Sequence, residues 1–121
     1  MTYTFKQINS LEKRIAESTR LCEKYPGRVP VICEKFTGDK YLPELSKTKY
    51  IFPANTTVGH FLFTVRSNIH ALKPHLALFA FVNNTSPPVN SRLDDLYDSF
   101  KDSDGFLYVL LSSESVFGEQ K

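Results

Sequence analysis

The strongest constraint on the fold is a continuous apolar run near the C-terminus, Phe106-Leu-Tyr-Val-Leu-Leu111. A run of this length and composition is typical of a strand buried on both faces. A short polar tail follows, reaches Phe117-Gly118, and is extended by Glu119-Gln-Lys121. Because glycine lacks Cβ, a chain ending there can enter a narrow enzyme channel and approach a reactive atom closely. The alternative for such a tail is a frayed terminus without function.

Size and composition indicate one soluble globular domain. The chain has 121 residues, of which 41% are hydrophobic and 23% are charged, which is ordinary for such a domain. No apolar stretch approaches the roughly 20 residues of a membrane span, and no signal peptide opens the sequence. Two cysteines are too few for a disulfide scaffold, so the cytosol is the expected compartment.

Charge is unevenly distributed, although the net value is only +2. Residues 1–28 carry six bases and three acids, whereas residues 92–104 carry two bases and five acids. The basic end could face an acidic peptide or anionic lipid. A solvated helix surface is the simpler explanation for both segments.

The first quarter of the chain is predicted to be helical. A short helix is expected around Thr4–Ile8. A longer helix, which ends before Pro26-Gly27, carries a stripe of mainly apolar residues along one face. Its N-cap is either Asn9, in a capping box with Glu12, or Ser10. The stripe, which we expect to face the core, comprises Ile8, Leu11, Ile15, Ser18, Cys22 and Tyr25.

Two strands follow. In 28–36, Val29, Val31 and Cys33 alternate with Pro30, Ile32 and Glu34. In 47–53, two lysines and Pro53 are typical guards of a sheet edge. Pro30 has no N–H and cannot donate to a ladder.

The rest alternates helix and strand. Thr56 or Thr57 is expected to cap a helix with an apolar stripe from Val58 to Ile69, and 76–82 is predicted to be a central strand. Ser91 is expected to cap a short helix before the final strand. The order ββαβαβ from residue 28 predicts an α+β, ubiquitin-like β-grasp: a mixed four-stranded sheet on a central helix, with two extra N-terminal helices. We therefore divide the chain into an N-terminal helical extension packed on the core (1–27), a β-grasp core (28–111) and a flexible tail (112–121).

The residue patterns of common enzyme classes are missing. The sequence has no Gly-rich phosphate loop and no G-x-S-x-G. Its three histidines and two cysteines lack metal-ligand spacing, so we expect no metal and no cofactor. Cys22 and Cys33 both fall on predicted inner faces, where a thiol usually fills space. A Cys–His nucleophile stays open in principle, and nucleic-acid binding is disfavoured by the balanced charge.

Six phrases together resemble the autophagy ubiquitin-like modifiers, the family of GABARAP and microtubule-associated light chain 3. In order, they are Glu12-Lys13-Arg14, Tyr25-Pro-Gly-Arg-Val-Pro-Val-Ile32, Lys49-Tyr-Ile-Phe-Pro53, Phe81-Val-Asn-Asn84, Asp104-Gly-Phe-Leu-Tyr108 and Glu114-Ser-Val-Phe-Gly118. They cover essentially the whole chain, and their order makes the resemblance specific.

The resemblance implies a protein tag and not an enzyme. A cysteine protease would cut after Gly118, next to Phe117, and E1-like and E2-like enzymes would pass the freed carboxylate to phosphatidylethanolamine. The protein would be a cytoplasmic monomer that joins the autophagosome membrane when lipidated. The other possibility is a β-grasp adaptor that binds peptides or membrane surfaces without being conjugated.

The resemblance also implies capture of aromatic-x-x-aliphatic receptor motifs by β-augmentation at the 49–53 edge strand. The aromatic's pocket would use Glu17, Leu21, Pro30, Ile32, Lys49, Ile51 and Phe106. The aliphatic's pocket would use Tyr50, Phe52, Pro53, Phe61 and Val65. Arg28, Lys47 and Lys49 would meet acidic ligand groups. Pro30 and Phe106 are expected to be apolar groups on an open face, which favours a partner there.

Three positions depart from the family pattern. Thr64 stands where relatives carry a larger aliphatic residue, Asn68 replaces a basic residue, and Ala80 replaces a large aromatic. Thr64 is expected to shrink the apolar lining of the second pocket, and Asn68 to remove one possible partner for acidic ligand groups. Ala80 is expected to require compensating packing.

Overall fold

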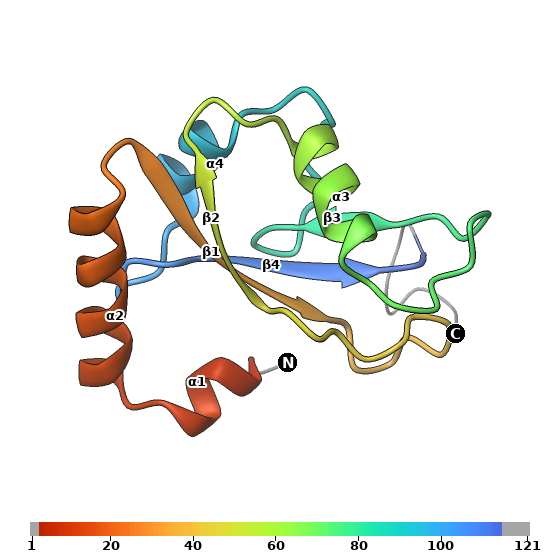
Figure 1. The fold of residues 1–121 in the computed structure, drawn as a ribbon, viewed down its shortest axis with the longest axis horizontal. Helices are drawn as coiled ribbons and strands as arrows, with labels where there is room; N and C mark the ends of the chain where they lie inside the picture. Colours follow the sequence, from red (N-terminus) through yellow and green to blue (C-terminus); the bar gives the residue numbers. More distant parts are fainter. Residues whose placement is uncertain (1–2, 115–121) are drawn as a thin grey trace.

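The computed structural model describes residues 3–114, which form four helices and four strands (Figure 1). The helices are α1 (Thr4–Ile8), α2 (Leu11–Lys24), α3 (Val58–Ser67) and α4 (Leu93–Phe100); the strands are β1 (Arg28–Lys35), β2 (Lys49–Pro53), β3 (Phe79–Phe81) and β4 (Leu107–Ser112). The expected processing site at Phe117-Gly118 lies outside the described residues.

The strands form one mixed sheet in the order β2-β1-β4-β3, as expected for a β-grasp. β1 is antiparallel to β2 and parallel to β4, and β3 is antiparallel to β4. β2 is an edge strand, as its lysines and proline indicated. Pro30 is accommodated in central β1 because the pairing of β1 with β4 begins only at Val31.

The prediction of a central strand over 76–82 is wrong. Only Phe79–Phe81 is a strand, and it forms the second edge of the sheet. The backbone before it turns, with Leu76 N donating to the Lys73 carbonyl at 3.0 Å. Leu76 and Leu78 are apolar because they pack on the core from this loop, not because they belong to the sheet.

Both faces of the sheet are covered. Side chains of α3 and α4 pack with Val29, Val31 and Cys33 on one face. On the other face, Leu21 of α2 and Phe5 of α1 pack against Ile32 and Phe106. The ring centroids of Phe5 and Phe106 are separated by 5.4 Å.

The expectation that Pro30 and Phe106 lie on an open face is therefore wrong. Both are fully buried, and so is Ile32. The N-terminal helices cover the face of the sheet on which these residues lie (Figure 1).

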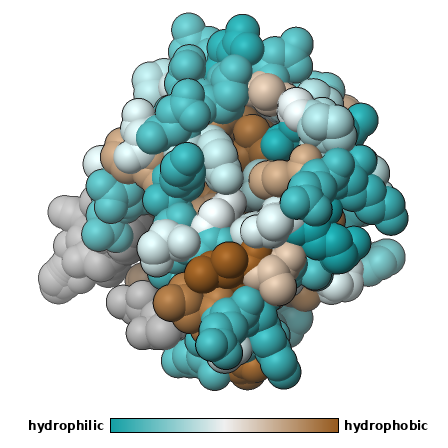
Figure 2. All heavy atoms as spheres, turned by 90° about the vertical axis from the view of Figure 1, so that its left-hand side faces the viewer, coloured by the Kyte–Doolittle hydropathy of each residue, from teal (hydrophilic) through white to brown (hydrophobic). Residues whose placement is uncertain are grey.

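The predicted inner stripe of α2 is also largely wrong. Ile8, Leu11 and Ile15 are 73%, 46% and 41% exposed, and Cys22 is exposed, whereas Cys33 is buried as predicted. The α2 side of the molecule is mainly hydrophilic, with a hydrophobic patch low in the view (Figure 2). The buried positions of α2 are Ser18 and Leu21.

A buried polar network explains why α2 turns this face inward. Arg14 Nη1 lies 2.8 Å from Asp104 Oδ2, and the Asp104 side chain is fully buried. The Tyr108 hydroxyl donates to the same oxygen at 2.5 Å, and Ser18 Oγ donates to the Asp104 carbonyl at 2.5 Å. Hydrogen-bonded partners offset the cost of burying these polar groups.

Helix caps agree with the sequence at two of three sites. Ser10 caps α2 by accepting from Lys13 N, so the Asn9 alternative is not used. Thr57 caps α3 by accepting from His60 N. The N-cap of α4 is Arg92, without a side-chain cap hydrogen bond, and not Ser91.

Candidate functional site: the free edge of β2

The outer edge of β2 is open, and its register fixes which backbone groups face outward. Cys33 N donates to the Thr48 carbonyl at 2.7 Å, so Cys33 and Thr48 form a hydrogen-bonded pair. Because such pairs alternate in an antiparallel ladder, Val31–Tyr50 bonds inward while Ile32–Lys49 and Pro30–Ile51 do not. The N–H and C=O groups of Lys49 and Ile51 therefore point away from β1. Within residues 3–114, no strand pairs with this edge.

A hollow of about 300 Å³, which we call the edge groove, lies along this strand. Three elements contribute to it: α2 and the residue after it, β2 with the segment before it, and α3 with its C-cap. Its lining comprises Leu21, Tyr25, Lys47, Lys49, Tyr50, Ile51, Phe52, Thr64 and Asn68. It offers an extended ligand apolar contacts beside free backbone donors and acceptors.

The floor of the edge groove is buried and aromatic. Phe52 packs against Phe61 with ring centroids 5.1 Å apart, and Tyr50 stacks on Phe52 at 5.6 Å. Tyr50 and Phe52 are only 5% and 7% exposed. Burial raises the pKa of the Tyr50 hydroxyl to about 12, so it stays neutral at physiological pH. The Lys47 ammonium lies 4.7 Å from the Tyr50 ring centroid, which places a cation at the groove's edge.

An ion pair separates the edge groove from a second hollow. Lys49 Nζ lies 2.5 Å from Glu17 Oε2, and Arg20 binds the same carboxylate at 2.9 Å. Hydrogen bonds from Arg20, and then from Lys49, hold the pKa of the Glu17 carboxyl at about 2. The second hollow, about 400 Å³, is lined by Phe5, Asn9, Lys13, Ala16, Glu17, Arg20 and Lys49. An acidic ligand group at Lys49 must compete with Glu17.

The structure brings together only part of the two predicted pockets. The edge groove is lined by three residues of the predicted first pocket, Leu21, Lys49 and Ile51. Two residues of the predicted second pocket, Tyr50 and Phe52, also line it. Glu17 lies beside it, on the second hollow.

The other predicted site residues lie elsewhere. Pro30, Ile32 and Phe106 are buried on the α2 side of the sheet, and Phe61 and Val65 lie in the core beneath the groove, each 1% exposed. Pro53 and Arg28 are exposed but line neither hollow.

Tyr25 lines the edge groove but is not among the predicted site residues. It falls on the predicted stripe of α2, directly before Pro26-Gly27, and this stop signal could have marked it as the end of a groove wall. Thr64 and Asn68, noted as departures from the family, both line the edge groove.

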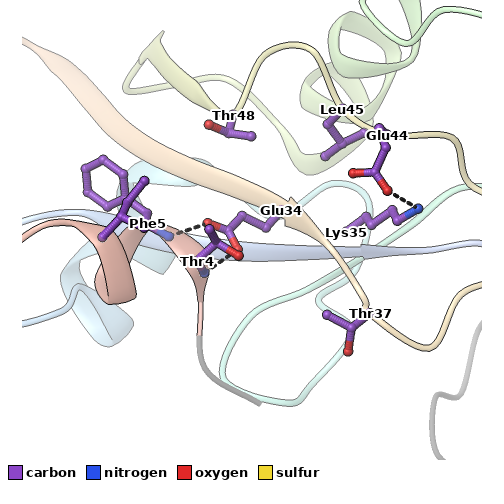
Figure 3. A pocket seen from close by; sticks show the side chains of 9 residues that line it. Thr4, Phe5, Glu34, Lys35, Thr37, Glu44, Leu45 and Thr48 are labelled. Carbon is purple, nitrogen blue, oxygen red and sulfur yellow. Dashed lines mark hydrogen bonds and ion pairs between the residues drawn. The ribbon is translucent and has the colours of Figure 1, made fainter.

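A separate cavity of about 410 Å³ lies between α1, the end of β1 and the segment before β2 (Figure 3). Its charged groups already have partners. Glu34 accepts from Thr4 N and Phe5 N at 2.8 and 2.9 Å, and Lys35 contacts Glu44 at 3.2 Å. The hydrogen bonds of Glu34 join α1 to β1 at this cavity.

Within the described residues, no three His, Cys, Asp or Glu side chains gather to hold a metal ion. In the same part of the chain, no helix has the length and apolar character needed to cross a bilayer.

Comparison with known proteins identifies close relatives over nearly the whole chain. The model of the family "Autophagy protein Atg8 ubiquitin like" matches residues 13–118. Autophagy-related protein 8 of Candida glabrata is 48% identical and covers 99% of this chain and 100% of its own. Autophagy-related protein 8b of Arabidopsis thaliana is 48% identical, and the match covers 95% of this chain and 93% of the relative. The crystal structure of Trypanosoma brucei ATG8 has a TM-score of 0.89 at 34% identity, covering 98% and 100%.

Proposed function

This chain belongs to the Atg8 family of autophagy ubiquitin-like proteins, and from that premise we propose that it is a modifier conjugated to membrane lipid. Gly118 is the proposed attachment point. The family match ends at this residue, with three residues beyond it. The protein would move between the cytoplasm and the autophagosome membrane.

The proposed chemistry asks little of the chain itself. A cysteine protease hydrolyses the Gly118–Glu119 peptide bond, and an E1-like enzyme activates the freed carboxylate as an adenylate. The acyl group passes as a thioester to an E2-like enzyme and then to the amine of phosphatidylethanolamine, forming an amide. A tag of this kind supplies only an accessible carboxyl-terminal glycine, so we propose no catalytic role for its own side chains.

The second part of the proposal is capture of receptor motifs at the edge groove. The observation that carries it is the outward direction of the Lys49 and Ile51 backbone groups beside an apolar hollow. An extended aromatic-x-x-aliphatic peptide would add a strand to β2, so that backbone bonds give affinity and the hollow gives specificity. Lys47, at the groove's edge, suits acids in the ligand.

Gly118→Ala tests conjugation. In cells the parent should give a lipid-modified form of altered gel mobility, and Gly118→Ala should not. Both should have the same thermal stability, because residues 3–114, which contain all the described helices and strands, are unchanged. Purified chain treated with the family's protease should lose the mass of Glu119–Lys121.

The alternative is a β-grasp adaptor that binds peptides without being conjugated. An unmodified parent chain in cells, together with intact peptide binding, would favour this alternative. The edge groove supports both, so the mobility shift is the measurement that separates them.

A further inference from the structure

Asp39 binds Ser113, next to the last described residue of the chain. Its carboxylate accepts from Ser113 N at 2.6 Å and from Ser113 Oγ at 2.8 Å. The same carboxylate accepts from the backbone of Tyr41 and Leu42 at 2.9 and 3.0 Å. The loop after β1 is thereby joined to the end of β4, so the position of Ser113 is fixed.

Two loops surround this point and leave exposed side chains around it. A cavity of about 430 Å³ is lined by Lys40 and Tyr41 of one loop, Lys73, His75 and Leu76 of the other, and Ser113 with Glu114. Tyr41 is 63% exposed, and Lys40 and Lys73 are both exposed. We call Lys40, Tyr41, Lys73 and His75 the exit patch. The two loops lie at the end of the molecule opposite α2 (Figure 1).

The length of the tail limits how far the exit patch can be from the attachment point. Four residues, 115–118, connect Glu114 to the proposed lipid amide. Even fully extended, four residues span at most about 14 Å. Once Gly118 is joined to a lipid headgroup, the exit patch must stay close to the bilayer whatever path the tail takes.

The side chains of the patch suit an anionic bilayer surface. Asp39 keeps its negative charge, but its carboxylate oxygens accept hydrogen bonds from Ser113, Tyr41 and Leu42, and it does not line the cavity. Among the described residues, Glu114 is the one acid that lines the cavity, against Lys40 and Lys73. Lysines near a membrane are attracted to anionic headgroups, and a tyrosine suits the interface, where its ring and hydroxyl meet different surroundings.

We propose that the exit patch is the surface on which the lipid-attached protein contacts the anionic headgroups of its own bilayer. The inference rests on the proposed attachment through Gly118 and adds the face that the protein turns to the membrane. The edge groove lies on a different part of the surface, between α2 and α3, so it stays open to receptors.

Chemical coupling tests this orientation without any conjugation enzyme. The full chain carrying Cys22→Ser and Gly118→Cys is joined through position 118 to maleimide-phosphatidylethanolamine in vesicles; Cys33 is buried and does not compete. One vesicle set contains phosphatidylcholine only, and the other also contains phosphatidylserine. Acylation rates of Lys40 and Lys73 are measured by mass spectrometry, with Lys13 and Lys24 of α2 as internal controls.

We expect acylation of Lys40 and Lys73 to slow several-fold on the phosphatidylserine vesicles, and added salt to reverse the effect. Lys13 and Lys24 should react equally on both sets. Equal rates for Lys40 and Lys73 on both sets, or protection of Lys13 and Lys24 instead, would overturn the proposal.

Charge reversal provides a second readout, the nitration rate of Tyr41. Slower nitration on phosphatidylserine vesicles should persist in Lys13→Glu/Lys24→Glu and disappear in Lys40→Glu/Lys73→Glu; persistence in both would contradict the patch. Because coupling is chemical, failure here would count against the patch, whereas an absent mobility shift in cells would count against conjugation.

Discussion

At the residue scale, Ile51 allows ligand binding to be separated from folding. Its N–H points outward, and its pair with Pro30 carries no ladder hydrogen bond. Ile51→Pro therefore removes a donor for the ligand without breaking the ladder between β1 and β2. We expect calorimetry to show roughly tenfold weaker binding of an aromatic-x-x-aliphatic peptide, which corresponds to one hydrogen bond of about 1.4 kcal/mol.

Ile51→Val is the matched control because it keeps the N–H and trims one methylene group. It should retain most of the affinity. If both variants weakened binding equally, the side chain and not the backbone would carry the interaction, and β-augmentation would be the wrong mode of binding.

Two glycines with positive φ form a second matched pair. Gly27 has a φ of +80°, and a Cβ added there would meet nothing within 4 Å, whereas a Cβ at Gly105, φ +93°, would collide with Ser18 Oγ. Gly27→Ala should cost about 1 kcal/mol of unfolding free energy from backbone strain alone. Gly105→Ala should cost clearly more, because Ser18 cannot move without losing its hydrogen bond to the Asp104 carbonyl. Urea unfolding measures both, and equal costs would contradict the collision.

Glu17 gives a prediction about pH. Hydrogen bonds from Arg20, and then from Lys49, lower its pKa from 4.5 to about 2. A carboxyl with a lowered pKa stabilises the fold fully above its ordinary pKa, and loses that contribution as the pH falls through the lowered one. The carboxyl carbon of Glu17 should therefore titrate near pH 2 by NMR. In Lys49→Ala the midpoint should rise but stay below 4.5, because Arg20 remains; a midpoint at 4.5 in the parent would refute the ion pair.

At the element scale, α2 is held to the sheet by a polar contact as well as by Leu21. The Asp104 side chain is fully buried and the Arg14 side chain is 12% exposed. Removing one partner of a buried ion pair leaves an uncompensated charge, so Arg14→Ala should cost about 3 kcal/mol of unfolding free energy. Arg20→Ala, on the same helix, removes only an exposed pair with Glu17 and should cost clearly less, because solvent screens exposed pairs.

Urea unfolding of the two arginine variants checks this assignment. Equal losses of stability would mean that the Arg14–Asp104 pair does not anchor α2.

The sequence predicted where most elements lie but not which face of α2 is buried. Periodicity located β1, β2, α3 and β4 because their apolar residues do face the core. It failed on α2, where Ile15 is exposed and Arg14 is mostly buried. A hydrophobic pattern cannot anticipate that Asp104, ninety residues away, provides a partner for a buried guanidinium.

At the scale of the whole molecule, the candidate site could be predicted only in part for a related reason. The edge strand and its lysines follow from local composition. The groove beside them depends on how α2 and α3 approach β2, and that approach is set by contacts across the sheet. The family resemblance implies that Pro30 and Phe106 belong to the first pocket, and nothing in the local sequence reveals that α1 and α2 cover their face.

Attachment of many copies to one membrane should change the strength of receptor binding. A single motif has few anchors in the edge groove, and burial of each offsets only part of the cost of association. We therefore expect one-motif peptides to bind weakly, and equally to free and vesicle-coupled protein. A tandem peptide with two motifs should bind the vesicle-coupled protein about 10²-fold more tightly, because the second contact becomes intramolecular.

Surface plasmon resonance with free and vesicle-coupled protein measures this gain. The control is the tandem peptide with the aromatic residue of its second motif changed to alanine, which should bind like the single motif in both formats. If the intact tandem peptide gained equally on free protein, then two copies would already be associated in solution. The expected monomer would be wrong, and the bilayer would not be what brings two edge grooves within reach of one receptor.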